Sequence, residues 1–269
     1  MKRKLFLSCI LVSALFLVGT KKPEREKIDK PVPLNIQFIN QVGNQPLHLN
    51  TEEYSNNSGE SFTVSTLQYF ISNIKFRNKS GKEYVVPQDS SYFLINENNP
   101  DSRQIRINVP EGDYDRIYFI VGVDSLRNTM PVGKRKGVLD PANSMDNGMY
   151  WGWNSGYIFF KMEGNSPKAP VDPTGQRKFR YHIGGFGGYS APTINNIKQI
   201  TIDLPDKGRI MARKENPSTT FVSADILKLF EGRTSIQISE HPSVMFSAFS
   251  VNIANNYSNL FSHHHTENP

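Results

Sequence analysis

Hydrophobic residues alternate with polar residues in many short stretches of this chain. Alternation with a period of two is typical of a strand that buries one face and leaves the other in water. Clusters of glycine, proline and asparagine separate the stretches and indicate turns. The clearest sets are Leu34, Ile36 and Phe38; Ile105, Ile107 and Val109; Ile117, Phe119 and Val121; Ile158, Phe160 and Met162; Phe179, Tyr181 and Ile183; and Ile200, Ile202 and Leu204. The pattern predicts a mainly β protein, built as a single antiparallel β-sandwich.

Two helices are expected late in the chain. Residues 223–231 predict a short one, with a serine cap and Gly232 after its end. Residues 242 to about 261 predict a longer one, with proline in its first turn. About twenty residues at a rise of ~1.5 Å would separate its ends by roughly 30 Å. His241 and His263 would then be too far apart to share one ion, so His241 is assigned to the start of the helix.

The N-terminus has the pattern of an export signal. Lys2, Arg3 and Lys4 precede an apolar run over 5–18, which is short for a membrane span of ~20 residues. We therefore expect residues 1–19 to direct export to the periplasm or cell envelope. The run ends like a lipoprotein signal but is followed by Thr20 instead of cysteine, which leaves a lipid anchor and the cleavage site open. Residues 20–33 are charged and proline-rich, which predicts a flexible tether before one domain over 34–269.

Composition narrows the chemistry. The single cysteine, Cys9, lies in the predicted signal, so the mature part has no disulfide and no thiolate ligand. A net charge of +6, from 31 basic and 25 acidic residues, is too small to indicate nucleic-acid binding. The densest mature basic cluster, Lys134-Arg135-Lys136, is typical of a solvated turn, with docking on an acidic protein as the alternative. No Ser-His-Asp or paired-acid motif stands out, and we expect no enzyme.

Both tryptophans lie in one run, residues 149–164. In an extended chain Met149, Trp151 and Trp153 would share one side, with Tyr150 on the other. Two indoles and a thioether would then form one surface. Large aromatic residues are more commonly buried in the core, and that reading stays open here.

The run resembles a family motif. Gly-Met-aromatic-Trp-x-Trp-x-Ser-Gly-Tyr-x-Phe-x-x-x-Glu-Gly is similar to the central motif of the MbnP-like family, periplasmic copper-binding proteins linked to methanobactin uptake. Other stretches agree in order: Leu67-Gln68-Tyr69-Phe70-Ile71-Ser72-Asn73-Ile74, Pro110-Glu111-Gly112-Asp113-Tyr114, Gly122-Val123-Asp124-Ser125, Leu139-Asp140-Pro141, Tyr181-His182-Ile183-Gly184-Gly185, and Ile253-Ala254-Asn255-Asn256-Tyr257 to Phe261. The resemblance spans about residues 33 to 265.

The resemblance implies copper binding outside the cytoplasm. It also implies a partner, a di-haem cytochrome c peroxidase-like protein that can oxidise one tryptophan to kynurenine. Trp151 or Trp153 would be that tryptophan, because the chain has no third. Relatives with a four-cysteine pattern differ from this chain, which lacks those cysteines.

Three histidines are the predicted copper ligands. His182 lies between the apolar residues Tyr181 and Ile183 of a predicted strand, so it faces water or a site and not the core. Its match to the family's Tyr-His-Ile-Gly-Gly stretch favours copper binding, for which imidazole is a suitable ligand. His263 and His265 would share one side of an extended tail and could bind one ion, with His264 pointing elsewhere. A tag remnant or a disordered end is the alternative for this tail.

Two further residues are weaker candidates. His48, between two leucines, could point to either face of its strand. Met149 offers a soft thioether able to hold Cu(I), although methionine is more often a core gap-filler.

The sequence thus predicts an exported protein that sequesters or hands over copper. His182 and the C-terminal histidines would bind the metal beside the tryptophans, and a di-haem partner would oxidise one indole. The alternative is a non-enzymatic cell-envelope module that binds glycan or protein through exposed aromatics. A third reading is a structural envelope protein whose aromatics are core. Burial of the tryptophans distinguishes these readings.

Overall fold

The computed structural model describes residues 30–153 and 156–269. The predicted signal, 1–19, and most of the predicted tether lie outside the described residues. The first strand begins at Val32, so the last two residues of the predicted 20–33 tether belong to a sheet. Within the described part of the chain, no helix has the length and apolar character that crossing a membrane would need.

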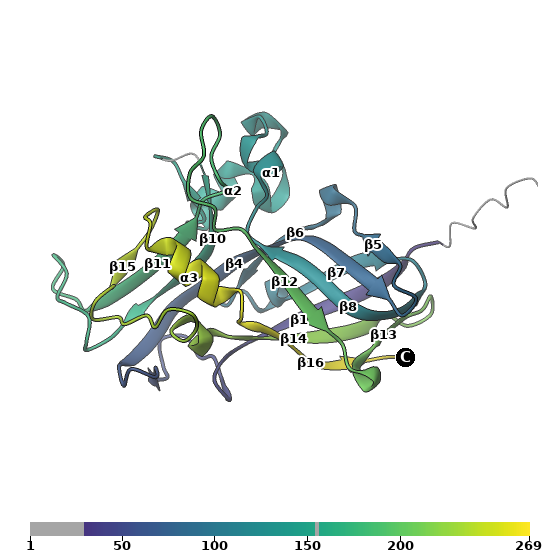
Figure 1. The fold of residues 1–269 in the computed structure, drawn as a ribbon, viewed down its shortest axis with the longest axis horizontal. Coiled ribbons are helices and arrows are strands. Elements are labelled where there is room, and N and C mark those ends of the chain that lie inside the picture. The colour runs from purple at the N-terminus through teal and green to yellow at the C-terminus, as the bar shows by residue number, and fades with distance from the viewer. Residues whose placement is uncertain (1–29, 154–155) are drawn as a thin grey trace, which may run out of the picture.

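The smaller of two sheets has five strands. They are β1 (Val32–Val42), β2 (Gln45–Pro46), β7 (Gln104–Val109), β14 (Ser218–Asp225) and β16 (Phe261–Glu267). Strand β1 pairs with β14 on one side and with β7 and β2 on the other, and β16 continues the sheet beyond β14. The C-terminal strand is therefore an edge of this sheet (Figure 1).

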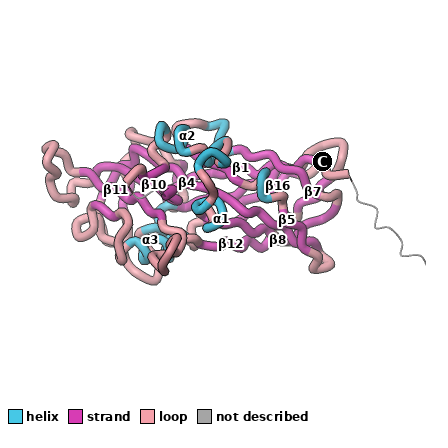
Figure 2. Tube along the Cα trace, turned by 90° about the horizontal axis from the view of Figure 1, so that it is seen from above, coloured by secondary structure: helices cyan, strands magenta, loops and turns pink. Residues whose placement is uncertain are grey.

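The larger sheet has eleven strands arranged around β4. They are β3 (Tyr54–Ser55), β4 (Ser61–Asn78), β5 (Glu83–Val85), β6 (Tyr92–Asn96), β8 (Gly112–Val121), β9 (Tyr150–Trp151), β10 (Gly156–Asn165), β11 (Lys178–Gly184), β12 (Lys198–Asp203), β13 (Ile210–Ala212) and β15 (Ser243–Val244). Figure 2 shows the strands running along the molecule, with two helices, α2 and α3, on either side of them.

The main core lies between the two sheets. Every second residue of β1 is buried, as the alternation predicts. Phe38 from this strand meets Tyr69 of β4, Phe119 of β8 and Phe261 of β16, all with edge-on ring contacts at centroid distances of 6.0 to 6.4 Å. Aromatic pairs of this geometry add to the stability that apolar burial gives. The prediction of a mainly β, sandwich-like fold is confirmed.

Two strand pairs depart from the predicted antiparallel arrangement. Strand β1 pairs with β14 in parallel, and so does β11 with β15. Parallel neighbours need a long crossover connection, and most of the chain lies between β1 and β14. Alternation within each strand carries no information about the direction of its neighbour.

A second apolar cluster covers part of the larger sheet. It contains Phe70, Val123, Leu139, Met149, Trp151, Tyr157, Ile158 and Phe159. Half of these residues come from the segment 123–151, which carries α1 (Ser125–Thr129) and α2 (Pro141–Asp146). Figure 1 shows these two helices together at one margin of the molecule. The tryptophan run is therefore anchored in a core of its own.

The first predicted late helix is wrong, and the second is much shorter than predicted. In residues 223–231, β14 continues to Asp225, and only Ile226–Leu229 forms a 3-10 turn. In residues 242–261, β15 comes first and the helix α3 spans only Ser250–Tyr257. Pairing of these segments with β1, β11 and β14 outweighs their local helix signals. The predicted distance between His241 and His263 assumed a continuous helix, and it therefore has no support.

Short 3-10 turns complete the described elements. They are η1 (Gln88–Ser90), η2 (Pro100–Arg103), η3 (Val132–Lys134), η4 (Gly137–Leu139), η5 (Asp206–Gly208) and η6 (Ile226–Leu229). Turns η3 and η4 lie between α1 and α2, in the predicted basic loop.

Candidate functional site

The two tryptophans form a contacting pair at the surface of the second cluster. Strand β9 places Trp151 opposite Gly156 and then ends, and Gly152 and Trp153 form a turn. Trp151 is 6% exposed, whereas Trp153 is 68% exposed. Their ring centroids are 5.5 Å apart, with the planes tilted by 42°. The two indoles are therefore in contact, but they do not form the predicted shared surface, because Trp151 is core and Trp153 faces water.

Met149 does not join that surface. It is fully buried and lies in the same cluster as Trp151. Tyr150 contacts Tyr157 at a centroid distance of 5.1 Å. The thioether is thus a packing residue of the core in this structure, which is the commoner role of methionine.

Glycines let the chain approach Trp151 closely. A Cβ built on Gly184 would lie 2.7 Å from the indole and 2.4 Å from the carbonyl oxygen of Tyr157. The following loop holds Gly185, Gly187 and Gly188 at positive φ, a conformation that favours glycine. The loop borders a cavity of about 180 Å³ beside Trp151, together with Phe246 and Tyr189.

Phe246 and Tyr189 are residues of this site that the sequence patterns missed. Phe246 meets Trp151 edge-on, at a centroid distance of 6.3 Å. Tyr189 is 77% exposed. The glycine run before Tyr189 was a usable signal, since four glycines beside a predicted ligand strand indicate close approach of the backbone. Phe246 carried no such signal, because it was assigned to a helix that does not form there.

His182 faces away from the main core, as predicted. It lies on β11 opposite Lys161 of β10, and its Nε2 is 2.6 Å from Oε1 of Glu163. The Lys161 amine is 3.7 Å from the same carboxylate and donates a hydrogen bond to the Gly148 carbonyl. The His182 hydrogen bond, together with the positive charge of Lys161, lowers the pKa of Glu163 although burial opposes this. Glu163 is therefore a carboxylate that orients the imidazole.

The C-terminal histidines lie on β16, at the edge of the other sheet. The register with β14 shifts between Phe221, opposite His265, and Val222, opposite His263. This bulge makes His264 an extra residue and interrupts the alternation. The expectation that His264 points away from His265 is wrong, because their Nδ1 atoms are 2.6 Å apart.

The two predicted ligands of this tail have different surroundings. The His265 ring stacks on Phe221 at a centroid distance of 4.0 Å. The His263 Nε2 is 2.9 Å from the Thr266 hydroxyl, and its ring packs on Gly208. Burial lowers the pKa of His263, and the neighbouring imidazoles add to this, so the ring is neutral at pH 7.

The structure does not bring the predicted ligands into one cluster. His182 lies on the larger sheet and His263 and His265 on the smaller one, with β11 and β16 well apart in Figure 1. Among residues 30–153 and 156–269, no group of three or more histidine, cysteine or acidic side chains is arranged to hold a metal ion. The ring contacts of the two indoles within the same ranges are with each other and with Phe246.

The remaining histidines have separate positions. His241 stacks on Phe249 at a centroid distance of 3.6 Å, in the segment that also carries Phe246. His48 is exposed. The segment of His241 reaches Trp151 through Phe246, and the strand of His182 reaches the same indole through Gly184. The predicted helix had concealed the placement of His241.

The fold and the site together define a mainly β protein of two sheets, with a half-exposed tryptophan pair in a separate apolar cluster. The sequence model of the MbnP family matches residues 31–246, and the chain therefore belongs to the MbnP family. The resemblance drawn from the motifs is confirmed. Membership connects the chain with a methanobactin-related, copper-associated role.

A solved structure shares this fold. MbnP from Methylosinus trichosporium is similar with a TM-score of 0.54 and 18% sequence identity, over 81% of this chain and 82% of that chain. A search of curated proteins gives no match.

Proposed function

We propose that this chain is an exported copper-binding protein that sequesters copper or hands it over. Its membership in the MbnP family is the observation that carries the proposal. Copper would be bound through imidazole nitrogens, which suit both oxidation states of the metal. The protein itself would act by binding and not as an enzyme.

His182 is the ligand that the local geometry supports best. Metal-binding histidines usually direct their other ring nitrogen at a carboxylate, which fixes the ring. In this chain Glu163 takes that position on Nε2 and leaves Nδ1 for a metal. The side chain of His182 is 14% exposed, so the imidazole is oriented by its surroundings before any ion arrives.

The C-terminal histidines would supply a second binding position. His264 and His265 direct their Nδ1 atoms toward each other, which is a starting arrangement for two imidazoles on one ion. His263 would add a ligand after a change of its contact with Thr266. Since these residues lie on a different sheet from His182, we propose two binding positions in place of one shared site.

Oxidation of a tryptophan by a di-haem partner would mature the protein. Trp153 is the indole that a partner reaches first, because it is exposed and Trp151 lies beneath it. Exposed Lys134 and Lys136 in the neighbouring loop would favour an acidic partner surface. We place this maturation in the periplasm or cell envelope.

A variant series tests the ligand assignment. The double variant His182→Ala with His265→Ala, purified from the native envelope, should weaken copper binding by about tenfold or more, because loss of a group that only orients a metal ligand already costs about 10- to 100-fold. His48→Ala serves as the control, since this histidine is exposed and outside both positions. Copper affinity that stays unchanged in the double variant would sink the assignment.

A second function is favoured by one observation. Trp153 and Tyr189 expose 68% and 77% of their surface, and such rings can stack on the apolar faces of sugars. A glycan-binding module would lose binding on Trp153→Ala and Tyr189→Ala, and copper would not affect it. A glycan array with and without copper chelator separates this function from the first.

A further inference from the structure

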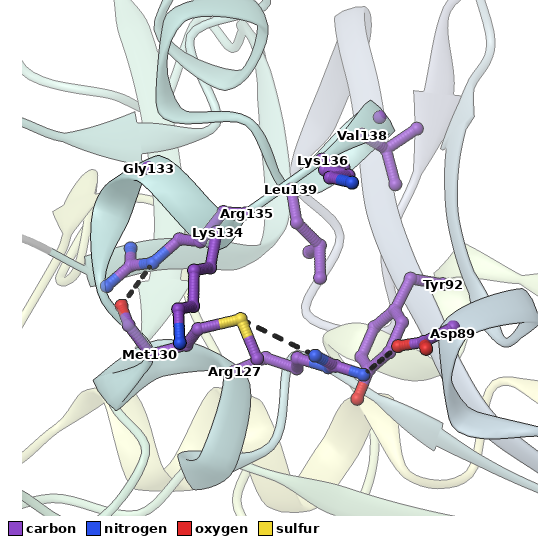
Figure 3. Close-up of a pocket in the computed structure, with 11 residues that line it drawn as sticks. Asp89, Tyr92, Arg127, Met130, Gly133, Lys134, Arg135, Lys136, Val138 and Leu139 are labelled. Atoms are coloured by element: carbon purple, nitrogen blue, oxygen red, sulfur yellow. Dashed lines mark hydrogen bonds and ion pairs between the residues drawn. The ribbon is translucent and has the colours of Figure 1, made fainter.

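A larger cavity lies beside the segment that connects α1 to α2. Its volume is about 780 Å³, within the range of small-molecule sites. Turn η1 and β6 contribute Asp89 and Tyr92, α1 contributes Arg127, and the loop 133–139 forms the remaining wall. Figure 3 shows these side chains arranged around one space.

The lining of this cavity is strongly cationic. It contains four basic side chains and a single carboxylate, that of Asp89. Arg135 is committed to the fold, because its guanidinium donates to the carbonyls of Met130 and Asn128 and to the Tyr150 hydroxyl. Lys134 and Lys136, on either side of it, are exposed and form no ion pair with any described residue. Their charges are therefore free for a ligand.

Arg127 is the other basic group of this cavity with a largely buried side chain. Its side chain is 13% exposed, and its one carboxylate partner, Asp89, is 90% exposed. Its Nη1 donates to the sulfur of Met130, at 3.5 Å, and its Nε has no hydrogen-bond partner among the described residues. The Tyr92 side chain also interacts with this guanidinium. A guanidinium stays charged in proteins, and a largely buried charge with a weak set of partners is costly. An oxyanion in the cavity would relieve that cost.

The other walls of the cavity are apolar. Val138 and Leu139 line it. Leu139 also belongs to the second apolar cluster, which holds Trp151, and Val138 packs on that cluster. The Tyr92 ring lies 5.4 Å from the Arg127 guanidinium. Its hydroxyl donates to Asp124 and accepts from Gln88, so it needs no hydrogen bond from a ligand. A bare inorganic anion would leave these walls uncovered.

We propose that this cavity binds a small organic anion. Arg127, Lys134 and Lys136 would hold its carboxylate, and its apolar body would cover Val138, Leu139 and the Tyr92 ring. Arg127 offers Nη1, whose hydrogen bond to the Met130 sulfur is weak, while its Nη2 stays paired with Asp89, and the lysines add charge at the mouth. The site is independent of copper, since none of its residues is among the proposed metal ligands.

Calorimetric titration with three probes tests the ligand class. We expect 2-naphthoate to bind at one site per chain, and the neutral isostere 2-naphthamide to bind about tenfold more weakly or worse, because it lacks the charge. Inorganic phosphate should also bind more weakly, since it leaves the apolar walls bare. Equal binding of the acid and the amide would overturn the anion requirement. Phosphate binding as tightly as naphthoate would overturn the requirement for an apolar organic body.

Variants then locate the site. Lys134→Ala with Lys136→Ala should weaken naphthoate binding by about tenfold, as should Arg127→Gln. The matched control is Lys168→Ala with Lys214→Ala, which removes the same charge from exposed positions elsewhere. If Arg127→Gln fails to fold, the lysine pair remains a test, because both lysines are exposed. Naphthoate affinity equal in the lysine pair and its control overturns the proposal.

Discussion

At the scale of single residues, the tryptophan pair shows where a sequence pattern stops being informative. Alternation placed Trp151 and Trp153 on one surface, and their rings do touch. It could not predict their different exposure, because β9 ends at Trp151 and the turn that follows carries Trp153 outward. A two-residue strand is too short to be recognised by period.

The difference in exposure has a chemical consequence. Limited treatment with N-bromosuccinimide should oxidise Trp153 before Trp151, because a reagent in water reaches an exposed indole first. Peptide mass spectrometry locates the modified residue. In Trp153→Phe the fast phase of oxidation should disappear. Equal modification of both indoles at early times would contradict the burial of Trp151.

Gly184 should be intolerant of a side chain. A methyl group there would meet the Trp151 ring and the Tyr157 carbonyl, so Gly184→Ala should cost about 1–3 kcal/mol of unfolding free energy through overpacking. Urea unfolding followed by tryptophan fluorescence measures this. Gly112→Ala is the control, since a Cβ at Gly112 meets nothing within 4 Å. A variant as stable as that control would show that the indole does not rest on Gly184.

At the scale of elements, strands were predicted well and late helices badly. Each alternating set quoted from the sequence lies in a strand, except that Leu204 directly follows β12. Burial of one face imposes the period of two directly. The serine at 223 and the proline at 242 were local helix signals, but partners remote in sequence decide those segments. The bulge at His264 was equally invisible, since it depends on the register with β14.

Glu60 shows how a single side chain anchors a segment without regular structure. It is buried at the start of β4 and accepts hydrogen bonds from the backbone N–H groups of Ile238 and Ser239, at 2.7 and 2.9 Å, and from the Asn56 amide. Burial acts to raise its pKa, but the hydrogen bonds of Ser239, Asn56 and Ile238 together lower it. The ionised form is therefore the one that stabilises the fold.

The lowered pKa of Glu60 predicts that the stability of the fold depends on pH. Since the pKa of Glu60 is lower in the folded state, its contribution is present above the unfolded pKa and is lost as the pH falls through the folded value. Glu60→Gln should cost about 1.5–3 kcal/mol at pH 7, the range for hydrogen bonds to charged groups, and less at about pH 3. Urea midpoints at both pH values measure it, with exposed Glu52→Gln as control. A cost that does not shrink in acid would contradict the ionised assignment.

At the scale of the whole molecule, the proposed sites are distributed over different parts of the fold. Trp151 and much of the lining of the proposed organic-anion cavity belong to the segment that carries α1 and α2. His182 lies on the larger sheet, and the C-terminal histidines lie on the smaller one. The sequence predicted the family and six of the sixteen described strands, because motifs and alternation are local. It could not predict this distribution, which depends on how the two sheets pack.

The central claim is that this member of the MbnP family binds copper. The most direct test is the metal content and intact mass of protein purified from its native envelope, compared with an unmodified recombinant sample. The account predicts bound copper in the native protein, and replacement of one carbon by one oxygen on a peptide that contains Trp151 or Trp153. Native protein that neither contains nor takes up copper, with both tryptophans unmodified, would contradict it.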